Sequence, residues 1–208
     1  MKREAMKKTL LSLSLALSAF AHAADLDNKP DVTQFDVAGV RLGMSVEEAQ
    51  AALAAKYPNG ELGKLETGGS PFDYKTKIAK NLRLKDGKQS VNVYFSTDTL
   101  NGKRDSIVVS RIMYSLPRTD ENLAALQAAA KEKYGEPTLG GSDSNYWRWC
   151  QEPEKVFAYE CSSHKKPTLT LASMMDTHLD LQNPEYKQAE RDALEAEKNT
   201  KPSTQDKT

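Results

Sequence analysis

Residues 45–57 read SVEEAQAALAAKY, and this stretch predicts an amphipathic helix as the first element of the fold. Ser45, followed three residues later by Glu48, has the pattern of a capping box, and Pro58 ends the helix. The apolar positions are spaced 3-4-4 and share one face: Val46, Ala49, Leu53 and Tyr57. A stripe this narrow needs a covering layer, so we expect the helix to lie on a β-sheet.

A second copy of this pattern follows later in the chain. The same 3-4-4 stripe returns as Leu123, Leu126, Ala130 and Tyr134. Thr119 is in place to cap this helix and Gly135 to end it. The frame GGSxxxY also occurs twice, at residues 68–74 and 140–146. We therefore predict an internal duplication. The alternative is two unrelated helix-plus-hairpin units.

Alternating segments after each helix predict strands. They cover residues 72–78, 90–96 and 106–116 in the first half, and 145–150 and 168–174 in the second. Asp86-Gly87 and Asn101-Gly102 are typical hairpin turns. The predicted fold class is therefore α+β, with two related units that each pack a helix on an antiparallel β-meander.

The predicted boundaries divide the chain into four parts. They are a signal peptide (1–23), a first helix-plus-meander unit (24–117), a second such unit with a disulfide (118–182), and a charged helix with a disordered tail (183–208). We expect the last helix to be a solvated appendage, and docking of a partner is the alternative.

The first 23 residues have the architecture of a cleaved secretory signal peptide. A basic start precedes an apolar run at 10–20, and Ala21-His22-Ala23 supplies small residues for cleavage between Ala23 and Ala24. Met6 is an alternative start to Met1. The run is too short to span a bilayer, and no cysteine near the cleavage site offers a lipid anchor. We expect a periplasmic or secreted protein without a membrane span.

The charge content limits the class of partner, and the two cysteines bear on a disulfide that would form after export. Beyond residue 23 the chain carries 25 Lys+Arg and 28 Asp+Glu, a mixed surface that argues against nucleic acid as a partner. Cys150 and Cys161 are expected to form a disulfide after export, with two buried thiols as the alternative. That bridge excludes a hairpin between 147–150 and 156–160, since it would hold the cysteines too far apart. We therefore expect strand 168–174 to pair with the tryptophan strand.

No motif for catalysis or for a cofactor is present. His164 and His178 lack the spacing of metal ligands, and there is no nucleophile elbow, phosphate-binding loop or dinucleotide fingerprint. We expect neither a metal nor a cofactor, and we expect the protein not to be an enzyme.

The strand YWRWC at 146–150 is the feature most suggestive of binding. Alternation places Trp147 and Trp149 on one face, beneath a helix, and Tyr146 and Arg148 on the other. Tyr and Arg are enriched at binding hot spots. The candidate binding face consists of Tyr74, Tyr94, Tyr146 and Arg148. The alternative is that these residues belong only to the core and its rim.

One segment carries a resemblance to known proteins. GVRLGMSVEE at 39–48, running into a helix that ends at Lys56-Tyr57-Pro58, resembles the opening of the small outer-membrane lipoprotein family that serves β-barrel assembly. Tandem copies of that family's unit resemble the fold of the secreted β-lactamase inhibitor protein, whose concave sheet presents aromatic residues to the enzyme. The resemblance implies a helix-on-meander fold and protein binding. The lipid-attachment cysteine of the lipoproteins is missing here.

Together these observations predict an exported, non-enzymatic module that binds or inhibits another envelope or secreted protein. The alternatives are an accessory protein of envelope assembly or stress, and a small-ligand carrier or hydrolase. A closed pocket with convergent polar groups would favour the carrier or hydrolase. A broad exposed sheet face of Tyr and Arg would favour the binding module.

Overall fold

The structure is a computed structural model, and it describes residues 31–141, 144–151 and 165–200. Several expectations lie outside these residues. They are the signal peptide with its cleavage at Ala23 and Ala24, the tail 201–208, His164, Cys161 and segment 156–160.

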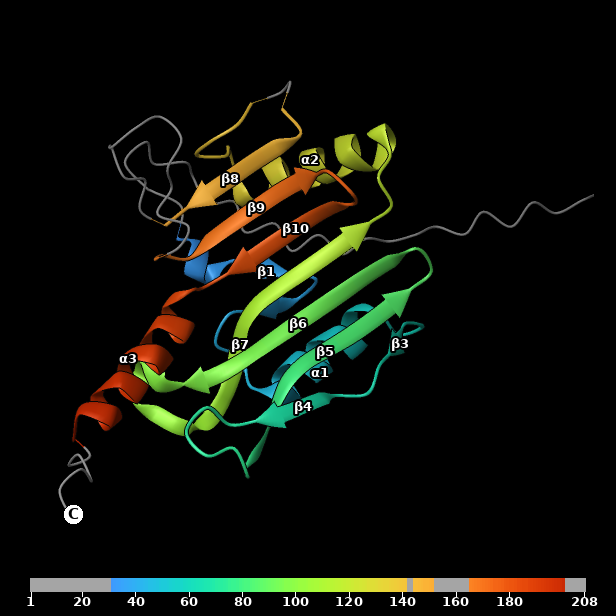
Figure 1. Cartoon of the computed structure of the whole chain (residues 1–208). Helices are drawn as coiled ribbons and strands as arrows, with labels where there is room; N and C mark the ends of the chain where they lie inside the picture. The colour runs from blue at the N-terminus through green and yellow to red at the C-terminus, as the bar shows by residue number, and fades with distance from the viewer. Residues whose placement is uncertain (1–30, 142–143, 152–164, 201–208) are drawn as a thin grey trace, which may run out of the picture.

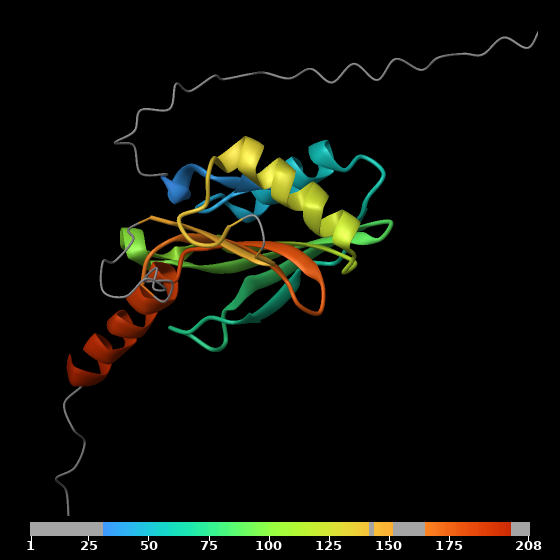
Figure 2. The same ribbon diagram turned by 90° about the horizontal axis from the view of Figure 1, so that it is seen from above.

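Two layers make up the molecule. α1 (Val46–Lys56) and α2 (Asp120–Tyr134) lie on one face of a large sheet, together with the short strands β1 (Asp36–Val37) and β2 (Val40–Arg41), as Figures 1 and 2 show. α3 (Glu185–Thr200) projects from one end of the sheet. The remaining short elements are the 3-10 helices η1 (Val32–Gln34) and η2 (Thr99–Asn101).

The large sheet has eight strands, and each neighbouring pair is antiparallel. They are β3 (Glu61–Leu62), β4 (Glu66–Gly69), β5 (Lys77–Asp86), β6 (Gln89–Asp98), β7 (Lys103–Leu116), β8 (Tyr146–Cys150), β9 (Thr168–Ser173) and β10 (Thr177–Gln182). Their order is β3-β5-β6-β7-β10-β9-β8, with β4 beside β5. The α+β class is thus confirmed. Two meanders, β5-β6-β7 and β8-β9-β10, join through β7 and β10 into one continuous sheet.

Both predicted helices begin at their predicted caps. Ser45 Oγ accepts the Glu48 backbone N–H while the Glu48 carboxylate accepts that of Ser45, which closes the capping box of α1. The Thr119 hydroxyl accepts the Asn122 N–H at the start of α2, and α2 ends before Gly135. Cap chemistry is local, so the sequence alone specifies these ends.

Two strand predictions need correction. Residues 72–76 form a turn rather than a strand, because Asp73 holds it by accepting the backbone N–H of Lys75 and the hydroxyl of Thr76. The strand β5 begins only at Lys77. The prediction also missed the short strands β1 to β4, and it missed β10, which contains His178 and lies between β7 and β9.

The tryptophan strand pairs as predicted. β8 pairs with β9, so that Trp147 lies opposite Leu171 and Trp149 opposite Leu169. Both indole rings are buried on the helix side of the sheet. The Trp149 Nε1–H donates to the Gly135 carbonyl at 3.1 Å, which ties the end of α2 to the sheet.

The core lies between the helices and the sheet. One continuous row crosses six strands in register and is fully or almost fully buried: Leu82, Val93, Ile112, Leu181, Leu169 and Trp149. Leu53 of α1 and Ala130 of α2 close this core from above. Because the row runs across both meanders without a gap, the sheet has one core.

α3 attaches to the body by its first turns. Tyr186 is buried, and Glu190 accepts a hydrogen bond from the Thr97 hydroxyl at 2.9 Å. Farther along, Glu197 pairs with Arg104 of β7. The predicted solvated appendage is therefore attached to the body both in its first turns and, through Glu197, near its end.

Candidate functional site: the open face of the sheet

The face of the sheet opposite α1 and α2 is called the open face here; Figure 1 looks onto it, with both helices behind. Strand register places three rows of side chains on it, each crossing β5, β6, β7, β10, β9 and β8 in that order. The rows are Lys85, Ser90, Ser115, His178, Ala172 and Tyr146; Arg83, Asn92, Met113, Asp180, Thr170 and Arg148; and Asn81, Tyr94, Arg111, Gln182, Thr168 and Cys150.

Two tyrosines on this face each lie against an arginine. The Arg111 guanidinium lies 5.4 Å from the ring centre of Tyr94, and that of Arg148 lies 5.1 Å from the ring centre of Tyr146. Arg148 Nε also donates to Thr170 Oγ1 at 3.3 Å. These contacts hold flat, amphipathic surfaces in place on a rigid sheet.

A bidentate ion pair between Arg111 and Asp180 lies at the centre of the face. Arg111 Nε and Nη2 each donate to a carboxylate oxygen of Asp180 at 2.8 Å. Hydrogen bonding to Asp180 raises the pKa of Arg111 further above its usual value, so this guanidinium stays charged. The pair joins β7 to β10, the two strands at which the meanders meet.

The sequence placed three of its four candidate residues on this face. Tyr94, Tyr146 and Arg148 all lie there, but Tyr94 is on β6 and Tyr146 on β8. Four strand spacings, or roughly 19 Å, separate these two strands, and the two tyrosines also lie in different rows of the face. Tyr74 is different: it lies in the loop between β4 and β5, with 85% of its surface exposed, and not on the face. Alternation along strands cannot place a loop residue.

A groove opens at the α3 end of the open face, with a volume of about 380 Å³. Three cationic side chains line it: Lys80, Arg111 and Lys187. The neutral residues of its walls are Tyr94, Phe95, Ser110, Gln182, Asn183 and Pro184, and no carboxylate lines it. The sequence offered no signal for this groove, because its residues come from five elements, β5, β6, β7, β10 and α3, that only the fold brings together.

The turn between β9 and β10 adds an apolar tip beside the same face. Met174 is 71% exposed and Met175 is 96% exposed. The turn is held in shape, since Arg118 Nη1 donates to the Met174 carbonyl at 2.8 Å. Tyr146 lies opposite Ala172, so the tip is at the Tyr146 end of the face. The sequence analysis did not single out these methionines.

Cys150 ends β8 and is buried. Its expected partner Cys161 lies outside the described residues, so the disulfide stays a prediction.

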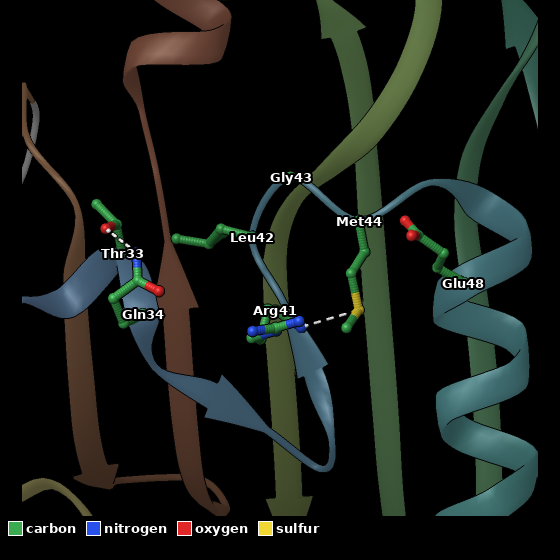
Figure 3. Close-up of a pocket in the computed structure, with 7 residues that line it drawn as sticks. All are labelled: Thr33, Gln34, Arg41, Leu42, Gly43, Met44 and Glu48. Atoms are coloured by element: carbon green, nitrogen blue, oxygen red, sulfur yellow. Dashed lines mark hydrogen bonds between the residues drawn. The ribbon is translucent and has the colours of Figure 1, made fainter.

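A second, smaller hollow of about 270 Å³ lies in the segment that carries the family resemblance, between η1, β2 and the start of α1 (Figure 3). The Arg41 backbone N–H points at Met44 Sδ, 3.3 Å away. Glu48, the one carboxylate in its wall, already accepts the Ser45 N–H. This hollow therefore follows from the capping of α1, and it gathers no pair of groups suited to acid–base chemistry.

Within residues 31–141, 144–151 and 165–200, no cluster of three or more His, Cys, Asp or Glu side chains is arranged to hold a metal ion. No helix in the same part of the chain is long and apolar enough to cross a membrane. No protein-family model, curated protein or solved structure matches the chain.

Proposed function

We propose that this chain is an exported, non-enzymatic protein-binding or inhibitor-type module, and that it grips another envelope or secreted protein through the open face. One observation carries the proposal: the face presents Tyr94 and Tyr146, each backed by an arginine, on rigid strands that α1 and α2 leave uncovered. Tyr and Arg dominate binding hot spots because they bring large contact area with little loss of side-chain freedom.

The exposed methionine tip supports the same function. Unbranched Met side chains adapt to the shape of a partner, and promiscuous binding surfaces are rich in them. Met174 and Met175 lie at the end of the face that Tyr146 occupies. Together they give the face an apolar rim at this end.

The proposal includes an origin by duplication. α1 precedes the meander β5-β6-β7 and α2 precedes the meander β8-β9-β10. Both Gly-Gly pairs also lie in a hairpin arm: Gly68 and Gly69 on β4 beside β5, and Gly140 next to Leu139, which pairs with Arg148. Two related helix-on-meander units joined at β7 and β10 account for this order, in keeping with the tandem fold that the sequence resembles.

The experiment is capture in the periplasm of the host. The chain from Ala24, tagged after Thr208, is expressed there, cross-linked briefly, and its partners are identified by mass spectrometry. A double variant, Tyr146→Ala with Arg148→Ala, removes one anchor of the open face. Tyr74→Ala is the matched control, because it removes an exposed tyrosine that lies off the face.

We expect one dominant envelope or secreted protein that the double variant loses and the Tyr74→Ala variant keeps. Circular dichroism of each variant establishes that it is folded. Equal capture by the double variant would refute the open face as the binding site. Capture of no protein at all would favour the alternative class, a small-ligand carrier or hydrolase.

A further inference from the structure

We infer that the partner presents an acidic segment, and that one of its Asp or Glu carboxylates is seated in the groove at the α3 end of the open face. This inference rests on the proposed function and names the chemistry of the partner. It is carried by the charges and by the unused hydrogen-bond donors of the groove.

The groove is rich in donors and free of carboxylates. Lys80 and Lys187 line it, and neither has an ion pair among the described residues. Arg111 donates two of its five N–H groups to Asp180, so three N–H groups remain for a ligand. Cations that are gathered without a counter-charge attract an anion.

The neutral groups of the groove point the same way. Asn183 Oδ1 accepts the Glu185 N–H at 3.0 Å, so its amide oxygen is already engaged, while both donors of its NH2 group remain for a ligand. The Tyr94 hydroxyl and the Gln182 side chain have no hydrogen-bond partner within the described part of the chain. With Lys80, Lys187 and the three remaining N–H groups of Arg111, the groove offers more donors than acceptors, which suits a carboxylate.

Charge across the rest of the open face favours an acidic segment over a single small anion. The three rows of the open face contain one carboxylate, Asp180, and four cations: Arg83, Lys85, Arg111 and Arg148. Glu61 and Glu66 lie only on the outer strands β3 and β4. An extended acidic segment contacts both the groove and these cations, whereas a single small anion fills only the groove.

The test is an NMR titration of ¹⁵N-labelled chain from Ala24 with a blocked hexaglutamate peptide at low salt. We expect saturable shifts at the amides of Tyr94, Arg111 and Asn183, and none with blocked hexaglutamine. The variant Lys80→Gln/Lys187→Gln should weaken binding by about fivefold or more. The control Lys56→Gln/Lys131→Gln changes the net charge equally but on the helix side, and should stay within about twofold.

Other occupants of the groove give different results. Three outcomes would each overturn the acidic-segment inference. The first is that inorganic phosphate produces the same amide shifts as the peptide at equal ionic strength. The second is that the chain sediments with phosphatidylglycerol vesicles and that Lys80→Gln/Lys187→Gln abolishes this, and the third is that the chain forms a dimer whose contact broadens the signals of these amides. The titration needs no natural partner. Absence of the shifts therefore refutes the groove even where capture identifies a protein, and their presence supports it even where capture returns nothing.

Discussion

Gly140 occupies a position at which the backbone leaves no space for a side chain. Its φ is +97°, and a Cβ there would lie 2.3 Å from the Tyr146 carbonyl oxygen and 2.9 Å from Trp147 Cδ1. Its neighbour Gly141 has no atom within 4 Å of the same position. The contact matters because it holds the segment that pairs Leu139 with Arg148 against the outer edge of β8.

This pair of glycines gives a matched prediction. We expect Gly140→Ala to lower the free energy of unfolding by at least about 2 kcal/mol, through strained φ and a backbone clash. Gly141→Ala should change it by no more than about 0.5 kcal/mol. Urea unfolding followed by tryptophan fluorescence measures both, and equal effects would contradict the close approach.

At the scale of elements, the end of α2 is fastened to Asp36 of β1 by two side chains, Tyr134 and Lys133, and the Lys133 Nζ lies 2.7 Å from the Asp36 carboxylate. The Tyr134 hydroxyl donates to the Asp36 carbonyl at 2.6 Å, and its ring lies 4.7 Å from that of Phe35. Burial, with a smaller contribution from Asp36, raises the pKa of Tyr134 well above its ordinary value. Burial likewise raises the pKa of Tyr57, after the end of α1, from 10.0 to about 12.

These shifts predict a loss of stability at alkaline pH. Above pH 10 the unfolded chain releases its tyrosine protons while the folded chain keeps those of Tyr57 and Tyr134, so the free energy of unfolding falls between pH 10 and about 12. The stabilisation is fully present below pH 10. In Tyr134→Phe the fall should be shallower, as urea unfolding at stepped pH would measure. An unchanged slope would show that Tyr134 titrates normally in the folded state.

Elements were predictable where their signals are local. The caps at Ser45 and Thr119 involve atoms three residues apart, so both helices could be predicted with their ends. β10 was missed although Thr177, Leu179 and Leu181 alternate with polar residues and are buried, which is the pattern that predicted the other strands. The strand in this region was predicted too early in the chain, at 72–78 instead of Lys77–Asp86. The reason is that lysine and arginine on the open face of β5 mask the apolar residues on its other face.

The candidate site was predictable only in part, for the same reason. Alternation fixes which face a strand residue takes, and this placed Tyr146 and Arg148 correctly relative to the tryptophans. It says nothing about which strands become neighbours. The Arg111–Asp180 pair and the groove depend on β10 lying beside β7, a pairing between residues about 70 positions apart.

At the scale of the whole molecule, one sheet with one core predicts one unfolding transition. Both tryptophans lie on β8, in the second meander, while circular dichroism reports on every strand and helix. Because the buried rows run through β7 and β10 without a break, we expect the two signals to coincide in urea. Separate midpoints would mean that the units 24–117 and 118–182 fold independently.

The position of β10 sets an order of events during synthesis. The first meander is complete at Leu116, but the edge of β7 finds its neighbour only when residues 177–182 arrive, about 60 residues later. At roughly 5–20 residues per second the ribosome takes several seconds to supply them, and for that time a long strand edge has no partner. A nascent chain of this topology therefore stays unfinished almost to its last strand.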